Sequence, residues 1–247
     1  MKLWLLKQKQ TQLWESTPAT VNAVYVLLKT GNNWLESEGK VNIQLGNITI
    51  DTKDAEAGTG YLSRAFDAPA IAPDMSKVKI TKEDEGPGWG ALYWQYFEDL
   101  DKITQAKTSL NVEKSLFIEK VTSAGKTLEP VSAGNPLKVG DKAIVRLTVR
   151  NDRDMEYVAL KDMRGACFEP VEQISGTRWR EKVVYYQSTR DASMNFFFYN
   201  LPKGTYVFEY PLFVTRAGEY SNGITTIQCM YAPEFVSHTA GERVIIK

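Results

Sequence analysis

The stretch that decides the fold is YVFEYPLFVTRAGEYSNG, residues 206–223, followed by CMYAPEFVSHT, residues 229–239. Apolar and polar residues alternate along it with a period of about two, which is typical of β-strands with one buried face. Glycine and asparagine at the breaks indicate turns. The stretch therefore predicts two strands joined by a turn, then a closing loop and a last strand, and it carries no catalytic pattern.

The same alternation continues upstream as far as about residue 110. Val145, Leu147 and Val149 face one way and Arg146 and Thr148 face the other, which predicts a strand with one wet face. Turn signals recur at roughly ten-residue spacing, as they do in sandwiches of about seven strands. We therefore expect residues 110–247 to form a seven-stranded antiparallel β-sandwich in a mainly β protein.

Residues 1–32 carry a helical period instead and predict an antiparallel helical hairpin. The first helix is expected from about residue 2 to residue 12. The second begins with Thr17 as N-cap and Pro18 at the first helical position, and it ends at Gly31. Its apolar face consists of Val21, Val24, Tyr25 and Leu28. A hairpin cannot bury such a face alone, so we expect it to dock on the β units, to pair with a second copy of the chain, or to fray.

Residues 33–109 return to a period of two and predict a small β unit. Its strands are expected near residues 41–50, 61–66, 77–81 and 91–97. We interpret the last, aromatic strand as half-buried, because aromatic residues favour pleated surfaces. An exposed, coplanar pair of Trp89 and Trp94 would instead offer a platform for sugars. Residues 101–109 are polar and unpatterned, which suits a linker.

The composition excludes several classes of partner. Thirty basic residues balance thirty acidic ones among 247 residues, so neither nucleic acid nor an anionic membrane surface is expected as the main partner. No apolar run approaches the roughly 18 residues of a membrane span. Lys7 and Lys9 interrupt the apolar N-terminal stretch and no cleavage site follows, so it is not a signal peptide. We expect the sequence to be a piece of a longer chain.

The residues for catalysis or metal binding are few. His238 is the only histidine, and its neighbour Ser237 would point to the opposite face of a strand, so the two form no nucleophile–base pair. The acidic runs at 83–85 and 98–99 lack the spacing of a calcium loop. We therefore expect no enzyme activity, no catalytic residues, no metal site and no cofactor.

The two cysteines, Cys167 and Cys229, lie in apolar, strand-like contexts. Two cysteines are too few for a disulfide scaffold, and buried free thiols are the simpler interpretation. A disulfide between them remains open in an oxidising compartment.

Four stretches resemble the C-terminal region of a bacterial, Bacteroidetes-type alpha-2-macroglobulin family protein. They are WLLKQKQTQLWESTPAT at 4–20, GPGWG at 86–90, ACFEP at 166–170 and MYAPEF at 230–235. The resemblance implies three parts. Residues 1–32 would be the remnant of a thioester-type helical domain, residues 33–109 a CUB-like β segment, and residues 110–247 a C-terminal macroglobulin-like sandwich.

What the family implies is broad-spectrum protease trapping in a bacterial cell envelope. The partners would be proteases, captured by a full-length parent, and other domains of that parent. The parent would be extracytoplasmic, in the periplasm or at the cell surface, as a lipoprotein. The family thioester requires Cys-x-x-Gln, but Pro170 and Ala232 stand where Cys167 and Cys229 would need glutamine. This chain by itself is therefore expected to be a non-catalytic part without trapping activity.

A different class of function stays open beside this one. A surface β-sandwich that binds a glycan or a protein would have the same strand pattern and the same lack of catalytic residues. Exposure of the aromatic residues near Trp94 would favour that alternative.

Overall fold

The computed structural model describes residues 2–30, 41–53, 55–57, 60–83, 88, 90–123, 125–180 and 182–247. The chain divides into two compact units, each described here by itself. The larger unit contains Leu3–Trp14 and Tyr96–Lys247, and the smaller one contains Glu15–Gln95. The first N-terminal helix thus belongs to the larger unit and the second to the smaller one. The expected division into residues 1–32, 33–109 and 110–247 stays a prediction.

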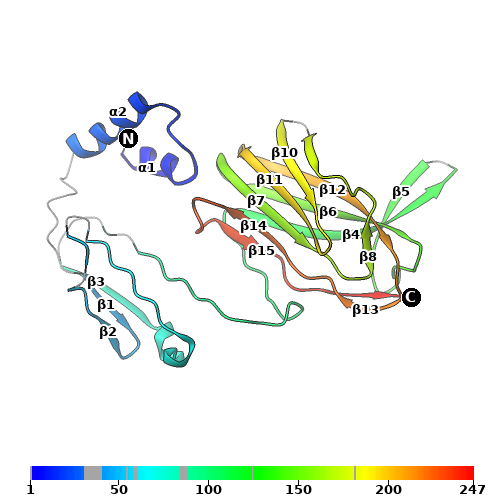
Figure 1. Ribbon diagram of the computed structural model, residues 1–247, viewed down its shortest axis with the longest axis horizontal. Helices are drawn as coiled ribbons and strands as arrows, with labels where there is room; N and C mark the ends of the chain where they lie inside the picture. Colours follow the sequence, from blue (N-terminus) through cyan, green and yellow to red (C-terminus); the bar gives the residue numbers. More distant parts are fainter. Residues whose placement is uncertain are drawn as a thin grey trace. The chain divides into compact units, whose positions relative to one another are not determined.

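The larger unit is a β-sandwich, as the alternation predicted (Figure 1). Its first sheet has six antiparallel strands in the order β15-β14-β7-β11-β10-β9. Their bounds are β7 Met155–Met163, β9 Gly176–Arg180, β10 Val183–Thr189, β11 Ser193–Leu201, β14 Thr225–Cys229 and β15 Val236–His238.

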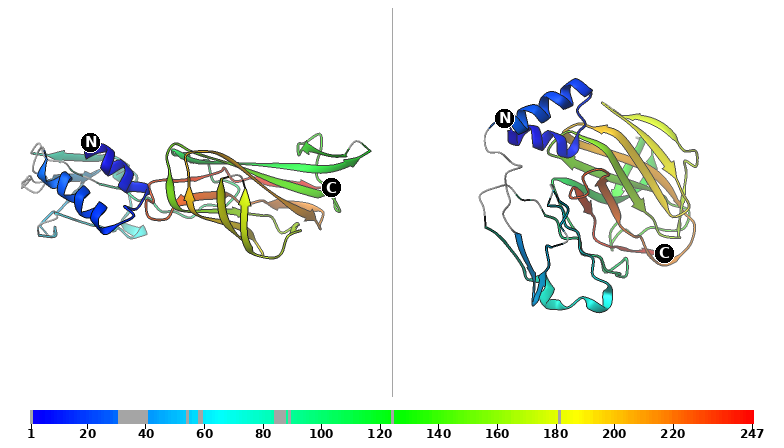
Figure 2. Two further views of the ribbon diagram at one scale, coloured as in Figure 1. Left: turned by 90° about the horizontal axis from the view of Figure 1, so that it is seen from above. Right: turned by 60° about the vertical axis from the view of Figure 1, so that its left-hand side comes forward.

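The second sheet has five antiparallel strands in the order β5-β4-β6-β12-β8. Their bounds are β4 Leu110–Thr122, β5 Gly125–Pro130, β6 Lys142–Asn151, β8 Phe168–Pro170 and β12 Gly204–Val214. A separate pair joins β13 Gly218–Ser221 to β16 Arg243–Ile246. The structure thus has more strands than the expected seven, because short edge strands carry too few residues to show a period. The hairpin of β4 and β5, in green, projects beyond the other strands (Figure 2).

The core of the sandwich follows from the alternation of its strands. On β6, Val145, Leu147 and Val149 are buried while Arg146 and Thr148 are partly exposed, as expected. Aromatic rings fill the centre: Phe208 of β12 lies 5.8 Å from Phe196 and 5.2 Å from Phe198, between ring centroids. Tilted ring pairs at these separations add about 0.5–1.5 kcal/mol each to the area that they bury. These contacts join the five-stranded sheet to the six-stranded one.

The smaller unit contains one helix and a three-stranded sheet. The sheet has the order β2-β1-β3, and 3-10 turns η1 and η2 precede β3. The bounds are α2 Thr17–Lys29, β1 Val41–Leu45, β2 Ile48–Ile50, η1 Ala68–Ala70, η2 Pro73–Ser76 and β3 Val78–Lys82. Its described buried apolar side chains are Ala23, Leu45 and Met75. So small a core offers little burial to offset the entropy of ordering the chain.

The first helix, α1 (Lys2–Thr11), lies where it was expected, but the start of α2 corrects the prediction. Ser16, not Thr17, is the N-cap, and its Oγ accepts a hydrogen bond from the backbone N–H of Ala19 at 3.3 Å. The error has a simple cause, because Ser16 and Thr17 are both good caps and only the backbone conformation separates them. The expected end at Gly31 lies outside the described residues.

Two expected strands are absent. Residues 61–66 and 91–97 form no strand, although β3 matches the expectation for 77–81. A strand needs a partner for its backbone groups, and no described strand pairs with either segment. In the described part of the chain, no helix is both long and apolar enough to cross a membrane.

Candidate functional site

The histidine and serine that the sequence singled out serve the fold. Ser237 is fully buried, donates a hydrogen bond to the carbonyl of Leu110 and accepts one from the N–H of Thr108 at 2.8 Å. His238 is half-buried, and its Nδ1 lies 3.1 Å from the carbonyl oxygen of Thr239. The backbones of His238 and Ala106 exchange two hydrogen bonds. Neighbouring residues of β15 thus have separate partners, and the structure does not bring them together as a catalytic pair.

Cys167 and Cys229 are both buried free thiols, so the structure contains no disulfide between them. Burial raises the pKa of the Cys167 thiol from 9.0 to about 11, and burial raises the pKa of Cys229 as well. A thiol held protonated in this way is a poor nucleophile at neutral pH.

The described residues of the acidic runs, Glu83, Glu98 and Asp99, lie outside helices and strands. Asp99 forms an exposed ion pair with Lys102, 2.6 Å between Oδ2 and Nζ, and two of the three residues at 83–85 lie outside the described residues. Among the residues that the structure describes, no group of three or more His, Cys, Asp or Glu side chains could hold a metal ion.

The aromatic segment departs from its interpretation as a half-buried strand. Tyr93, Trp94, Tyr96 and Phe97 are all exposed, and half of the Trp94 surface is open to solvent. Trp89 lies outside the described residues, so its relation to Trp94 stays untested. The alternation predicted burial wrongly, because no strand that the structure describes pairs with this segment to form a sheet.

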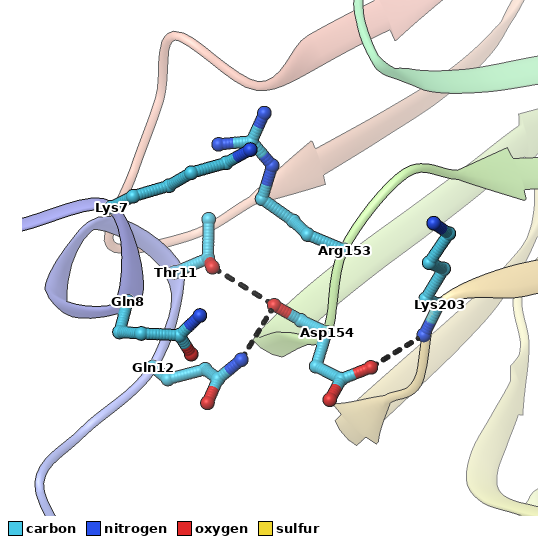
Figure 3. A pocket seen from close by; sticks show the side chains of 7 residues that line it. All are labelled: Lys7, Gln8, Thr11, Gln12, Arg153, Asp154 and Lys203. Carbon is cyan, nitrogen blue, oxygen red and sulfur yellow. Dashed lines mark hydrogen bonds between the residues drawn. The ribbon is translucent and has the colours of Figure 1, made fainter. Parts of the chain in front are cut away.

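A surface that the sequence did not single out lies at the end of the sandwich where α1 docks (Figure 3). A shallow cavity of about 190 Å³ opens there between α1 and the loops before β7 and β12. Its lining residues are Lys7, Gln8, Thr11, Gln12, Arg153, Asp154 and Lys203. The lining is polar and mainly basic, and three of its side chains are cationic.

Hydrogen bonds fix α1 to this end of the sandwich. Thr11 Oγ1 and Gln12 Nε2 both donate to the backbone carbonyl of Asp154, at 2.9 and 3.2 Å (Figure 3). Just past the helix, the N–H of Leu13 donates to Glu156 Oε2 at 3.2 Å. Asp154 is itself positioned, since its carboxylate accepts the N–H of Lys203 at 2.7 Å. The loop before β7 therefore binds the C-terminal end of α1.

The same loop carries a planar cation in a fixed position. Arg153 donates from Nε and Nη2 to the two carboxylate oxygens of Asp152, at 2.8 and 2.9 Å, and its guanidinium lies 4.8 Å from the centre of the Phe235 ring. The hydrogen bond from Arg153 lowers the pKa of Asp152. Bidentate pairing and ring stacking together restrict the arginine to one orientation.

Three tyrosines form a cluster beside that loop: Tyr157 on β7, Tyr199 on β11 and Tyr231 in the turn after β14. Tyr157 makes edge-to-face contacts with Tyr199 and Tyr231, both with ring centroids 5.0 Å apart. Its backbone φ of 54° is the only positive value at a described non-glycine residue. The N–H of Met230 bonds to the Tyr157 carbonyl at 2.9 Å and holds the turn of Met230 and Tyr231 against the cluster. Met230, Tyr199 and Tyr231 are exposed.

The positive φ at Tyr157, a partly buried residue, is backbone strain of the kind that gathers at functional sites. Tyr and Met are enriched at the centres of protein–protein interfaces, where an apolar body and a polar tip are both useful. We define this end of the sandwich, which comprises the loop 152–154, the start of β7 and the tyrosine cluster, as the docking end. Residues 230–235 are among the stretches that resemble the family. Tyr157 and Tyr199 carry no such motif, and the sequence shows them only as aromatic residues at outward-facing strand positions.

Comparison with known proteins identifies a protein family that this chain matches. The family model described as the bacterial alpha-2-macroglobulin MG10 domain matches residues 110–234. A Dictyostelium discoideum protein named circularly permutated Ras protein 2 is 31% identical over 217 residues, which are 85% of this chain and 5% of that protein. The chain thus spans a small part of this relative's length.

Among solved structures, trypsin-activated alpha-2-macroglobulin from Escherichia coli matches with a TM-score of 0.50 and 13% identity, over 98% of this chain and 16% of that one. Salmonella alpha-2-macroglobulin reacted with methylamine matches with a TM-score of 0.45 and 17% identity, over 96% of this chain and 15% of that one. At such identities the first match speaks for the fold alone, and the second is too weak to support an argument.

Proposed function

Because the chain belongs to the family of bacterial alpha-2-macroglobulin MG10 domains, we propose that it is a non-catalytic C-terminal part of a macroglobulin-like protease inhibitor. The inhibitor would be a broad-spectrum protease trap of a bacterial cell envelope. The proposal places its parent in the periplasm or at the cell surface, anchored as a lipoprotein. It assigns the chain no catalytic residue and no cofactor.

The observation that carries the proposal is the docking end. A trap must hold its modules in a defined arrangement before a protease attacks, and it must then let them move. Three hydrogen bonds from the last residue of α1 and the two residues after it, to Asp154 in the loop and Glu156 on β7, are enough to place a helix. They do so without the large apolar burial that makes an interface permanent. The docking end therefore suits a releasable contact with a helical part of the same inhibitor.

The decisive experiment uses the complete gene product and two proteases, trypsin and porcine elastase. A trapped protease keeps its activity toward a small chromogenic peptide and loses it toward casein, because a cage excludes only large substrates. We expect that pattern for both enzymes at a stoichiometric ratio. Equal activity toward casein with and without the protein would contradict the proposal, and so would hydrolysis of either substrate by the protein alone.

Whether these hydrogen bonds hold α1 at the docking end can be tested with the protein of residues 1–247. Thr11→Val and Gln12→Ala each remove a donor to the Asp154 carbonyl, so amide hydrogen exchange along α1 should accelerate. Gln8→Ala is the matched control, since Gln8 lines the same cavity and has no described hydrogen bond from its side chain. Equal exchange in all three variants would show that these hydrogen bonds do not hold the helix.

Binding of a glycan or protein at a surface is a second candidate function, and the exposure of Tyr93 and Trp94 favours it. Exposed aromatic rings offer faces on which a sugar ring stacks. Titration with a soluble cell-wall oligosaccharide, followed by tryptophan fluorescence, tests this directly. A change that disappears in Trp94→Ala and persists in Trp179→Ala would favour this alternative over a purely structural role.

A further inference from the structure

The outer face of the six-stranded sheet carries large apolar side chains. Tyr186 of β10 and Phe197 of β11 lie opposite each other in the ladder and are 47% and 48% exposed. Two residues further along the same strands, Val184 and Tyr199 are 57% and 66% exposed. Positions two apart on a strand share a face, so these side chains form one patch and are not scattered single residues. Contiguous exposed patches of this kind mark interaction surfaces.

The strand registers place four side chains in one row across the middle of this face. From β10 through β11 and β7 to β14, the row contains Tyr186, Phe197, Ala159 and Gln228. None of the four is charged, and charged residues are depleted at the centres of protein–protein interfaces. The two rings occupy one half of the row. At its middle, the ring of Phe197 therefore stands beside the single methyl group of Ala159, so a raised half adjoins a low one.

A row of this kind is complementary to itself. β11 and β7 are the two central strands of the order β15-β14-β7-β11-β10-β9. A second copy, turned by 180° about an axis parallel to these strands and midway between them, would lay its row in reverse over the first. Phe197 of each copy would then cover Ala159 of the other, and Tyr186 would cover Gln228. Reciprocal contacts of this type are the ones that two-fold dimers use.

The neighbouring row adds charge complementarity to this arrangement. Lys161 of β7 is exposed and lies between Asn195 of β11 and Thr226 of β14. Under the same rotation, Lys161 of one copy would face Asn195 of the other, whose amide oxygen accepts a hydrogen bond from an ammonium group. No lysine faces a second lysine, so the copy avoids the repulsion that excludes wrong partners.

We propose that the protein forms a two-fold dimer through the outer face of the six-stranded sheet, with Phe197 of each copy packed on Ala159 of the other. Six strands about 4.8 Å apart and about five residues long give a face of roughly 450 Å² per copy. Two such faces bury about 900 Å², at the low end of specific interfaces, where complexes are weak and reversible. We therefore expect a dissociation constant on the order of 10–100 µM. The inference depends only on this sheet, so it holds whether or not the protein inhibits proteases.

The experiment is sedimentation equilibrium of residues 1–247 over a range of concentrations around the expected dissociation constant. Every sample carries Leu28→Glu, which puts a charge on the exposed apolar face of α2 and prevents association there. We expect the average mass to rise with concentration from that of one copy toward twice that value. Phe197→Glu should raise the dissociation constant at least tenfold, because it sets a carboxylate against Ala159 of the other copy. Phe213→Glu is the matched control and should leave it unchanged, since Phe213 lies on β12 in the other sheet and is 46% exposed.

A mixture of two variants tests the pairing of Phe197 with Ala159. Ala159→Lys alone should weaken the dimer, as Phe197→Glu does. An equimolar mixture of the two variants should associate again, because a dimer with one copy of each sets the new carboxylate against the new ammonium and keeps one unaltered contact. Circular dichroism confirms that each variant is folded. The mass of a single copy at every concentration, equal dissociation constants for Phe197→Glu and Phe213→Glu, or no association in the mixture would overturn the proposal.

Discussion

Lys114 and Asp162 form an ion pair between the two sheets of the sandwich. Lys114 Nζ on β4 lies 2.8 Å from Asp162 Oδ1 on β7, and the two side chains are 6% and 0% exposed. The carboxylate also accepts hydrogen bonds from the hydroxyls of Tyr210 and Thr225, and Lys114 donates to the carbonyl of Met163 at 2.7 Å. Burial, followed by the charge of Asp162, raises the pKa of Tyr210. The pair is therefore buried and held by hydrogen bonds from residues of both sheets.

Asp162→Asn should destabilise the sandwich by about 3–5 kcal/mol, because it leaves the Lys114 ammonium buried without an opposite charge. Urea denaturation followed by circular dichroism measures the loss as a lower midpoint with an unchanged slope.

The double variant Lys114→Met with Asp162→Leu tests the cause. It removes both charges, so it should be less destabilised than the two single losses added together. Asp99→Asn, in the exposed pair with Lys102, is the matched control and should change stability little. Additive effects in the double variant would show that the two charges do not interact.

The cysteines should resist thiol reagents in the folded protein. Because burial raises the pKa of Cys167 from 9.0 to about 11, we expect almost no reaction with DTNB at pH 8 and two thiols titrated in 6 M urea. The sign of the stability effect follows: the unfolded thiol ionises first, so the free energy of unfolding falls as pH rises from 9 toward 11. Cys167→Ala should remove part of that fall. Rapid labelling at pH 8 without denaturant would contradict the burial.

Gly223→Ala should destabilise the sandwich much more than Gly140→Ala. Both glycines have positive φ, 67° and 91°, so both substitutions cost about 1 kcal/mol of backbone strain. A Cβ at position 223 would also lie 2.5 Å from Met163 Cβ, whereas nothing lies within 4 Å at position 140. The clash should add about 1–3 kcal/mol. Thermal unfolding of the two variants measures the difference, and equal shifts in Tm would refute the contact with Met163.

The second helix should be the least protected element of the chain. The predicted apolar face of α2, Val21, Val24, Tyr25 and Leu28, is exposed in the structure. We expect fast amide exchange along α2 at low concentration and slower exchange at high concentration, as copies associate through that face. Leu28→Glu should remove the concentration dependence, and Lys29→Glu, also on α2, should not. Protection of α2 equal to that of β6 in a monomeric sample would contradict this.

Local pattern was enough for most of the sandwich. Alternation over residues 143–149 predicted β6, and the run from 206 onward predicted β12, because in a strand between two neighbours each side chain faces either the core or solvent. Helix α1 was located by its period to within one residue. Ser237 and His238 do lie next to each other on one strand, β15, where neighbouring side chains point apart.

Sequence by itself determined the mainly β class, the N-terminal helices and the central strands, because each depends on the spacing of neighbouring side chains. Only the tertiary structure decided which strands have partners, since pairing depends on what lies alongside. Among the strands that the structure describes, it placed none beside residues 91–97. It also brought Tyr157, Tyr199 and Tyr231 into one cluster. Contacts between residues so far apart in the chain leave no period in the sequence.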